Sequence, residues 1–407
     1  MTRVVVTGMG CVSALGRGVA ATWTALKEGR SGLAWTKVEG ADSSLFVEAP
    51  IGQVREEDGF EPQGLADGKS FKTMDRFCRL AVISAAEALA DSSLADAKYD
   101  PDDVAIIYGS STGGLTSLEE SYFRIYGQRV GRVHPMTVPR FMGSGAASVI
   151  SLTFGFTGPA WCISSACASS SHAIAEATYL IKAGRAKAVL TGGAEASITY
   201  GHTLAWQRLG ALAKDACRPF SVNRSGMALA EGAAALVLED YDAAKKRGAP
   251  IYGEITGMGY SSDAYHLTQP KTGGAVKAMQ QALKQSGLDS DTRFLISTHG
   301  TGTELNDVSE AAALRSVFAD NLDQQVAIAT KSSHGHLLGG TGALQLAVGI
   351  LALKAGLAPP VCNFEGPDPA CPLPLAVGEP VPLKDTALIS NSFAFGGLNS
   401  VLVVTPV

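Results

Sequence analysis

Short apolar runs rich in valine, isoleucine and alanine alternate along the chain with longer runs in which apolar residues recur every three or four positions. The short runs are typical of buried strands, and the longer spacing is typical of amphipathic helices. The pattern predicts strands over residues 4–7, 104–108, 160–163, 188–191, 234–239, 294–297, 326–330, 387–390 and 401–404. It predicts helices over residues 20–27, 76–90, 171–183, 274–285, 309–318 and 342–353. Such alternation indicates an α/β protein.

Four motifs of the first part of the chain recur, in the same order, in its second part. Val-Thr-Gly-Met-Gly at 6–10 is echoed by Ile-Thr-Gly-Met-Gly at 255–259, and we expect each motif to end a strand. The other pairs are the glycine-rich loops at 108–114 and 297–303, the serine-containing turns at 164–170 and 331–336, and the segments 190–195 and 395–399. A period this long is unlike that of a solenoid. It predicts two similar halves, residues 1–250 and 251–407, with a site where they meet.

The composition indicates a large apolar core. Of the 407 residues, 46% are hydrophobic and 17% are charged, against about 25% charged in an average globular protein. Because soluble monomers rarely expose wide apolar patches, we expect another subunit to cover part of the surface, in a homodimer or a heterodimer. The formal net charge is −5 and the chain has no run of basic residues, so we expect no nucleic-acid ligand.

Two long stretches without charge, 141–175 and 337–353, have the length of membrane spans. Both contain glycines and polar residues, so we expect buried elements and no membrane span. The N-terminus leads directly into a predicted strand without the features of a signal peptide, which predicts a cytoplasmic protein. The seven cysteines are odd in number and lack the spacing of a zinc site, so neither disulfides nor a metal are expected. We also expect no cofactor.

Cys167 lies between the predicted strand at 160–163 and the helix that follows it, in a stretch of serines and alanines. A helix N-terminus stabilises a thiolate, so we expect the pKa of this thiol to be lowered. The alternative is a buried core cysteine, which is how we interpret Cys162. Small neighbours on both sides favour a nucleophile that a thioester approaches closely.

Two histidines of the second half lie in loops that are counterparts of loops in the first. His299 follows a predicted strand and is enclosed by glycines and threonines, a composition that lets a ligand approach the backbone. His336 lies at a turn before a helix, five residues after Lys331 and close to His334. The alternative is that each histidine only caps its own loop.

Together these motifs resemble the β-ketoacyl-acyl-carrier-protein synthases of the elongating type, synthases I and II. The resemblance rests on Ser-Ser-Ala-Cys-Ala at 164–168, His-Gly-Thr-Gly-Thr at 299–303, Gly-His-Leu-Leu-Gly at 335–339 and Asn-Ser-Phe-Ala-Phe-Gly-Gly at 391–397. It implies a thiolase-like fold, a five-layered αβαβα arrangement of two similar halves. It also implies acyl carrier protein as the partner that delivers the acyl and malonyl groups.

The resemblance assigns a decarboxylative Claisen condensation to these residues. Cys167 would take the acyl chain, and its backbone N–H and that of Phe395 would form the oxyanion hole. Neutral His299 and His336 would bind the malonyl thioester, and Lys331 would keep both rings uncharged. Three further positions would support this group. They are Asp307, Glu310 and Gln345. Glu310 would either pair with Lys331 or orient its loop, and the alternative is a solvated carboxylate.

Other positions carry roles by the same resemblance. Thr112, Phe393 and Phe395 would line or gate the acyl tunnel, although Thr112 suits a turn equally well. Lys69, Lys72 and Arg76 would dock the acidic carrier protein from an exposed helix face, or would only be solvated. Gln345 replaces the glutamate usual in synthase II, which removes a charge that helps bind a cation. The 391–397 motif is closer to synthases of Nod-factor acyl chains or of polyenes.

Two other functions remain open. The chain could be the chain-length-determining partner of a ketosynthase heterodimer, with little activity of its own. It could also be a hydrolase that uses Cys167, His299 and Asp307, although that reading gives no role to His336 or Lys331.

Overall fold

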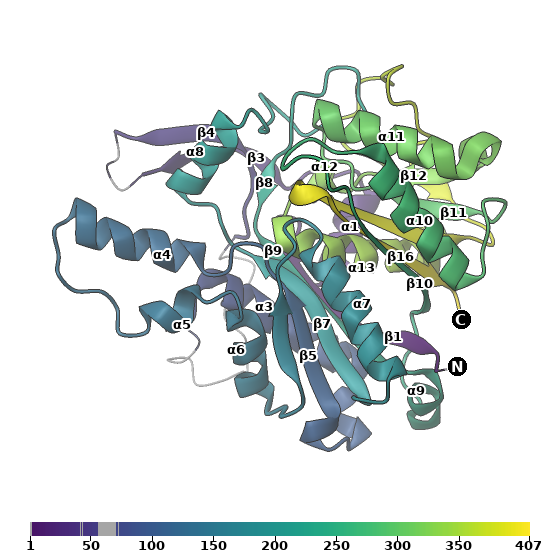
Figure 1. Cartoon of the computed structure of the whole chain (residues 1–407), viewed down its shortest axis with the longest axis horizontal. Helices are drawn as coiled ribbons and strands as arrows, with labels where there is room; N and C mark the ends of the chain where they lie inside the picture. The colour runs from purple at the N-terminus through teal and green to yellow at the C-terminus, as the bar shows by residue number, and fades with distance from the viewer. Residues whose placement is uncertain (1, 41, 43, 56–70, 72) are drawn as a thin grey trace.

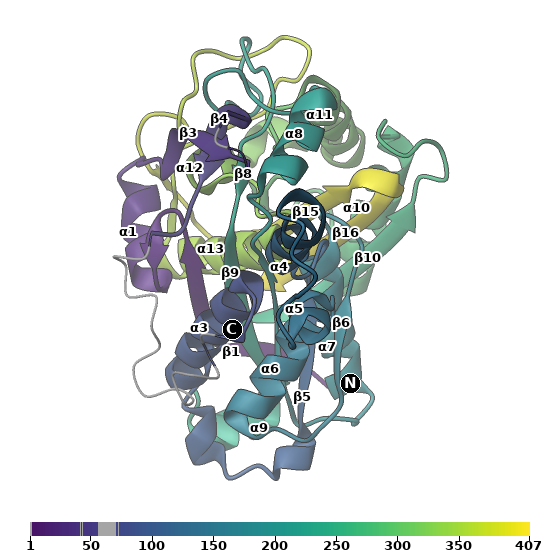
Figure 2. The same cartoon turned by 90° about the vertical axis from the view of Figure 1, so that its left-hand side faces the viewer.

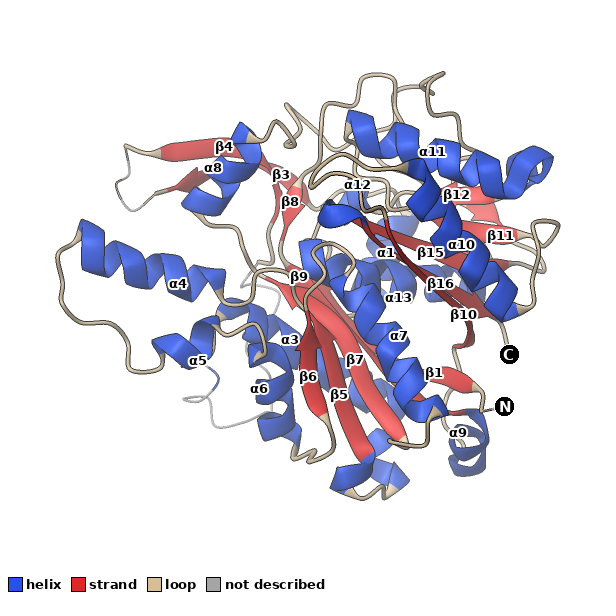
Figure 3. Cartoon of the chain, viewed as in Figure 1, coloured by secondary structure: helices blue, strands red, loops and turns tan. Residues whose placement is uncertain are grey.

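The computed structural model describes residues 2–40, 42, 44–55, 71 and 73–407. Its centre is one continuous mixed sheet in the strand order β12-β11-β15-β16-β10-β1-β9-β7-β5-β6, with β2 paired to the side of β1 (Figure 1, Figure 3). The first-half strands of this sheet are β1 (Val4–Ser13), β2 (Gly16–Arg17), β5 (Val104–Gly109), β6 (Ala160–Ile163), β7 (Ala188–Glu195) and β9 (Gly232–Asp240). The second-half strands are β10 (Gly253–Ser262), β11 (Phe294–Ser297), β12 (Val326–Ile328), β15 (Ala387–Ala394) and β16 (Leu398–Thr405).

The strand order repeats on the two sides of the β1–β10 junction. These two strands pair antiparallel through Val5 with Glu254 and Val6 with Gly253. Outward from the junction, β9, β7, β5 and β6 follow on one side, and β16, β15, β11 and β12 follow on the other. In both halves the three outermost strands run parallel to one another. The sheet thus has the same topology on both sides of this junction, while the division into halves at residues 1–250 and 251–407 stays a prediction.

Helices complete a five-layer arrangement, as the family resemblance implies. The first-half helices are α1 (Val19–Lys27), α3 (Arg76–Ser92), α4 (Leu115–Tyr122), α5 (Thr137–Phe141), α6 (Gly145–Phe154), α7 (Ser169–Lys182), α8 (Tyr200–Arg208) and α9 (Tyr241–Arg247). The second-half helices are α10 (Thr272–Ser286), α11 (Glu304–Phe318), α12 (Lys331–His334) and α13 (Thr341–Ala355). Apolar side chains of α7 and α13 share one core between the two halves of the sheet, while α3 and α6 cover one outer face and α10 and α11 the other.

Side chains along the central strands alternate between these cores. Val104, Ile106 and Tyr108 of β5 belong to the outer core with α3, while Ala105 and Ile107 belong to the central core. This two-residue period is what a strand buried on both faces requires. Residues Leu338–Ala355 have the length and composition of a membrane span, yet 78% of that stretch is buried inside the protein. The prediction that the apolar stretch around 337–353 is a buried element is confirmed.

The prediction that the two Gly-Met-Gly motifs end strands is wrong. Both strands continue past the motif, β1 to Ser13 and β10 to Ser262. A Cβ atom on Gly8 would lie 2.3 Å from the carbonyl oxygen of Ala88 in α3, and one on Gly257 would lie 2.2 Å from that of Ala282 in α10. The glycines are there because a helix packs directly onto the strand. Each strand also has a register shift at the preceding threonine.

Several elements lie outside the layered core. A small sheet of β3 (Leu33–Glu39), β4 (Phe46–Gly52) and β8 (Leu229–Ala230) lies beside α8, and β13 (Leu357–Ala358) pairs with β14 (Val381–Pro382). Figure 2 shows α4, α5 and α6 on the side of the molecule that carries β6. The sequence pattern did not predict the small sheet, α4 or α5. The helix α6 lies in the charge-free stretch 141–175, which was expected to be buried, yet its Leu152 is 83% exposed.

Candidate active site

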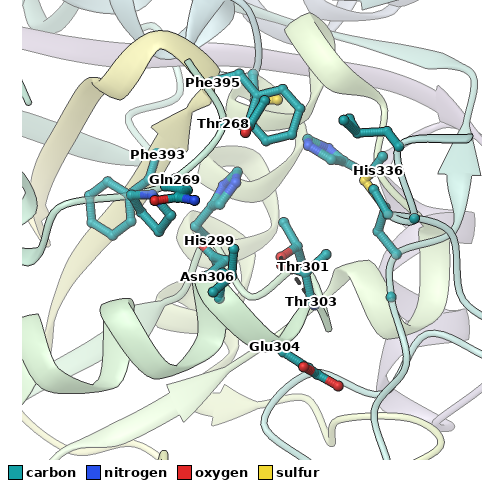
Figure 4. A pocket seen from close by; sticks show the side chains of 18 of the residues that line it. Thr268, Gln269, His299, Thr301, Thr303, Glu304, Asn306, His336, Phe393 and Phe395 are labelled. Atoms are coloured by element: carbon teal, nitrogen blue, oxygen red, sulfur yellow. Dashed lines mark hydrogen bonds between the residues drawn. The ribbon is translucent and has the colours of Figure 1, made fainter. Parts of the chain in front are cut away.

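A cavity of about 850 Å³ lies where the two halves meet, and it is lined by Cys167, His299 and His336. Cys167 lies between β6 and α7 of the first half, His299 follows β11, and His336 precedes α13 of the second half. The two histidine rings lie edge to face at the cavity, with their centroids 5.5 Å apart and their planes at 82° (Figure 4). The fold thus brings together the thiol and the two imidazoles that the sequence analysis singled out.

Cys167 lies in a tight turn just before α7. The residue before it, Ala166, has φ of 48°, a left-handed conformation that is uncommon for a residue with a side chain. Ser165 N–H donates to Ser169 Oγ at 2.9 Å, which closes the turn onto the first residue of α7. The turn leaves the thiol 8% exposed at the cavity wall.

The pKa of the Cys167 thiol is raised to about 11, so the predicted lowering is wrong. Burial is the main cause, and the Glu195 carboxylate adds to it. Three groups act in the opposite direction, namely the Lys331 ammonium and the backbone N–H groups of Phe395 and Cys167 itself. The groups that stabilise a thiolate are therefore present, but desolvation outweighs them in the free protein.

Glu310 fixes the loop that carries His299. Its carboxylate accepts hydrogen bonds from the backbone N–H of His299 at 2.7 Å and of Gly300 at 2.8 Å, and from Asn391 Nδ2 at 3.1 Å. Glu310 is buried, which excludes the solvated alternative. Its hydrogen bonds orient the loop, and its charge acts on Lys331 by raising the lysine pKa against the effect of burial.

Lys331 determines which nitrogen of His299 carries the proton. Its ammonium is buried, donates to the carbonyl oxygen of His299 and to Gln345 Oε1, and lies 3.5 Å from His299 Nδ1. An ammonium can only donate, so Nδ1 accepts and the proton of the neutral ring is on Nε2. Burial lowers the pKa of Lys331 to about 8, which leaves it charged at neutral pH.

His336 is held by the helix that follows it. Its Nδ1 lies 2.9 Å from Oγ1 of Thr341, the first residue of α13. Burial, and then the nearby Lys331 charge, lower the pKa of both His299 and His336 well below the ordinary value. Both rings are therefore neutral at pH 7, as predicted, although burial contributes more than Lys331.

His334 is a structural residue rather than a second candidate. Its Nδ1 bonds to the carbonyl oxygen of Gly335 at 2.7 Å and its Nε2 to Thr330 Oγ1 at 2.9 Å. Both ring nitrogens are thus occupied within the α12 segment. The ambiguity between His334 and His336 is resolved in favour of His336, which lines the cavity.

Asp307 supports a backbone turn and not a catalytic histidine. Its carboxylate accepts from the backbone N–H of Phe220 at 2.7 Å and of Gly302 at 3.2 Å, and lies 3.7 Å from Arg224 Nε. Burial raises the pKa of Asp307 to about 6. A hydrolase needs a carboxylate on the histidine that activates the cysteine, and the bonds of Asp307 among the described residues go elsewhere.

The residues around Gln345 do not fit a bound cation. Gln345 Oε1 accepts from Lys331, and Nε2 donates to the carbonyl oxygen of Thr298 at 2.7 Å. Both ends of the amide are thus occupied, and one of them by a cation of the protein itself. Among the described residues there is no group of three histidine, cysteine or acidic side chains that could hold a metal ion.

Other predicted positions have different surroundings from those expected. Thr112 Oγ1 donates to Glu195 at 2.6 Å, and Thr112 is not among the described residues that line the cavity. Arg76 is not on an exposed face, because its guanidinium forms a half-buried pair with Glu231 at 2.6 Å. Lys69 and Lys72 lie outside the described residues. Phe393 and Phe395 line the cavity, as the resemblance implies.

Two residues of the site were missed in the sequence. Trp206 of α8 lines the cavity and stacks on Phe395. Glu195, at the end of β7, accepts hydrogen bonds from the 110–112 loop of the first half and from Gly339 N–H of the second half. No motif marks Trp206. Glu195 lies in a segment of the internal repeat, and an acidic residue at the end of that apolar strand could have been recognised as a site residue.

Family models match most of the chain. The model described as "Beta-ketoacyl synthase, N-terminal domain" matches residues 1–244, and "Beta-ketoacyl synthase, C-terminal domain" matches residues 252–365. The chain is 37% identical to "Nodulation protein E" of Rhizobium meliloti (strain 1021), with 98% of each chain covered. It is 35% identical to "3-oxoacyl-[acyl-carrier-protein] synthase 2" of Synechocystis, covering 98% of this chain and 97% of that protein.

Solved structures agree with these matches. "The ishigamide ketosynthase/chain length factor" has a TM-score of 0.92 at 30% identity, over 100% of this chain and 99% of that one. A type II polyketide ketosynthase, AntDE, in complex with its acyl-carrier protein AntF, has a TM-score of 0.88 at 27% identity over the full length of both chains. The similarity therefore extends over the whole chain and includes both halves of the cavity.

Proposed function

Because this chain belongs to the β-ketoacyl synthase family, we propose that Cys167, His299, His336 and Lys331 are the residues with which it condenses acyl chains. The chain is an acyltransferase, a ketosynthase that joins an acyl chain to a malonyl group delivered by acyl carrier protein and so extends a fatty acid or polyketide by two carbons. The observation that supports these roles is the single cavity shared by one thiol and two neutral imidazoles.

The first step loads the acyl chain. Cys167 Sγ attacks the thioester carbonyl of the acyl-loaded carrier, and the carrier thiol leaves with the proton that Cys167 gives up. The backbone N–H groups of Cys167 and Phe395 already act on the cysteine sulfur. They are therefore well placed to donate to the carbonyl oxygen when it becomes an oxyanion, as its carbon bonds to that sulfur.

The second step forms the new carbon–carbon bond. The bond between the malonyl α-carbon and its carboxylate breaks, carbon dioxide leaves, and the electron pair remains as a thioester enolate. The Nε2–H groups of His299 and His336 donate to the enolate oxygen, which a neutral imidazole does without giving up its proton. The enolate carbon attacks the acyl-Cys167 thioester, and the Cys167 thiolate leaves.

Lys331 and Glu310 position this pair of histidines rather than react themselves. Lys331 keeps the His299 proton on Nε2, and Glu310 holds the backbone of the His299 loop. Phe393 packs against His299 with ring centroids 6.1 Å apart, which supports a role for Phe393 in shaping the acyl path. A cytoplasmic location is part of the proposal, supported by the burial of Leu338–Ala355, the stretch of the described chain that has the length and composition of a membrane span.

Mass spectrometry of the carrier protein tests the proposal. After incubation with acyl-loaded and malonyl-loaded carrier, the wild-type protein should yield a 3-oxoacyl carrier extended by two carbons. Cys167→Ala should abolish this product, while Cys162→Ala, at a cysteine outside the cavity lining, should retain it. If Cys167→Ala left the product unchanged in the presence of a second ketosynthase subunit, the chain would instead be the chain-length-determining partner.

A further inference from the structure

The rings of Trp206 and Phe395 stack at the edge of the active-site cavity. Their centroids are 5.4 Å apart with an interplanar angle of 28°. Trp206 belongs to α8 of the first half, and Phe395 to the turn after β15 of the second half. The Phe395 ring is 37% exposed, and its turn continues through Gly396 and Gly397 with φ of 80° and 69°. Because both glycines lack side chains, the hydrogen bonds of the turn and the contacts of the Phe395 ring determine where Phe395 lies.

Trp206 is itself held by a hydrogen bond on α8. Its indole Nε1–H donates to Nε2 of His202, one helical turn earlier, at 2.9 Å. The His202 Nδ1 lies 2.8 Å from the carbonyl oxygen of Ser197, in the connection between β7 and α8. A carbonyl only accepts and an indole N–H only donates, so both bonds require the neutral ring with its proton on Nδ1. Burial lowers the pKa of His202 and favours that neutral form.

On its far side, the turn is hydrogen-bonded to residues of the second half. Gly396 N–H donates to the carbonyl oxygen of Leu267 at 2.8 Å, and the carbonyl oxygen of Gly397 accepts from Asp263 N–H at 2.9 Å. The ring of Phe395 thus contacts the first half through Trp206, while Cys167 also belongs to the first half. The chain Ser197–His202–Trp206 connects the Phe395 turn to the half that carries the nucleophile.

We propose that Trp206 and His202 form a latch that holds the Phe395 turn with its backbone N–H directed at Cys167. Both are positioning residues, because they act on the reaction through Phe395. The inference rests on the proposed function in one respect, that the Phe395 N–H serves as an oxyanion donor. The latch does not close the cavity. It fixes the position of the Phe395 N–H, on the second half, relative to the Cys167 sulfur on the first.

His202→Phe tests the latch, because it removes the acceptor of the indole N–H while keeping a ring of similar size. Two rates are measured, acylation of Cys167 by an acyl-loaded carrier and alkylation of Cys167 by iodoacetamide as a function of pH. Since removing an oxyanion donor outright costs a hundredfold or more, we expect a loosened donor to slow acylation by about tenfold. The alkylation midpoint should move to higher pH, because the Phe395 N–H lowers the thiol pKa.

Two matched variants make the outcome specific. His202→Gln keeps an acceptor oxygen, so both rates should stay close to those of the wild type. Trp35→Phe changes an exposed tryptophan of β3 and should leave both rates unchanged. Where His202→Phe does not fold, Trp206→Phe keeps the stacking, loses the indole donor and should shift both rates in the same direction. The latch is wrong if folded His202→Phe or Trp206→Phe stays within about twofold of wild type in both rates, the range of an ordinary surface substitution.

The alkylation measurement separates this inference from the proposed function. Iodoacetamide reacts with the thiol without malonyl or carrier protein. If the wild-type protein forms no carbon–carbon bond and the latch variants still shift the alkylation midpoint, the proposed function fails and the latch remains.

Discussion

At the scale of single residues, the site is governed by burial more than by any one charge. Burial is the largest cause of the shifted pKa values of Cys167, His299, His336 and Lys331. Each group is thereby displaced toward its uncharged form. For the histidines this favours hydrogen-bond donation without proton transfer. For the cysteine it means that the free protein holds the uncharged thiol. The thiolate forms only during the reaction, when the sulfur takes up or releases the acyl group.

Asp307 offers a measurable consequence of this burial. Its pKa is about 6 in the folded protein and 3.8 as an ordinary value, so the folded state binds the proton more tightly. The Asp307 contribution to stability is therefore fully present below pH 4 and is lost as the pH rises to 6. Compared with Asp307→Asn, which does not titrate, the wild-type protein should lose about 2 kcal/mol of unfolding free energy between pH 4 and pH 6, and about 3 kcal/mol in all once the pH is well above 6.

Urea unfolding of both proteins at pH 4, 5, 6 and 7 measures this difference. Asp289→Asn, at an exposed position near the end of α10, is the matched control for the loss of a surface carboxylate. A difference between wild type and Asp307→Asn that does not change between pH 4 and pH 6 would show that the buried carboxylate is not destabilised as described.

The residue types of the site were predictable from the sequence, while their electrostatics were not. Cys167, His299 and His336 stand in short motifs whose chemistry is recognisable. The sign of the Cys167 pKa shift depends on burial by residues distant in the sequence, among them Ile51, Leu229 and Leu338, which no local motif records. Arg76 shows the same limit, because Glu231, its partner, is 155 residues away in the sequence.

At the scale of elements, the internal repeat predicted the central layers better than the periphery. The strands at the centre are continuous apolar runs that are buried on both faces, and their existence could be predicted from composition. The helix α8, which supplies Trp206, has a short and weakly apolar sequence, so its contribution was missed. The repeat also located the Gly-Met-Gly motifs but not their purpose, which is the approach of α3 and α10 to the sheet.

That approach can be tested at Gly259. A Cβ atom there would lie 1.9 Å from the carbonyl oxygen of Ala278 in α10, so Gly259→Ala must push the helix away from β10. We expect a loss of about 1–3 kcal/mol of stability, the cost of overpacking a core. Gly273→Ala places a methyl group in open space at the start of α10 and should be neutral or slightly stabilising. Equal thermal unfolding midpoints for the two variants would contradict this account.

At the scale of the whole molecule, one face of the protein combines an unpaired strand edge with exposed apolar side chains. Among the described residues β6 pairs with β5 alone, so it forms an edge of the main sheet. Beside it, α6 carries Leu152, which is 83% exposed, and the neighbouring 122–142 segment exposes Tyr126, Met136 and Val138. An unpaired edge flanked by apolar side chains favours association. We therefore expect the second subunit of the predicted homodimer or heterodimer to lie on this face.

Two exposed leucines, one on this face and one at the cavity, allow the position of the subunit interface to be tested. Leu152 lies on α6 beside β6, and Leu267, which is 78% exposed, lies at the cavity instead. Leu152→Glu should weaken association, because a carboxylate would be desolvated at the centre of the apolar face. Leu267→Glu adds the same charge without touching that face and should leave the molecular mass in solution unchanged. Light scattering coupled to size-exclusion chromatography measures both, and a dimer that survives Leu152→Glu but dissociates with Leu267→Glu would place the subunit interface on the cavity side.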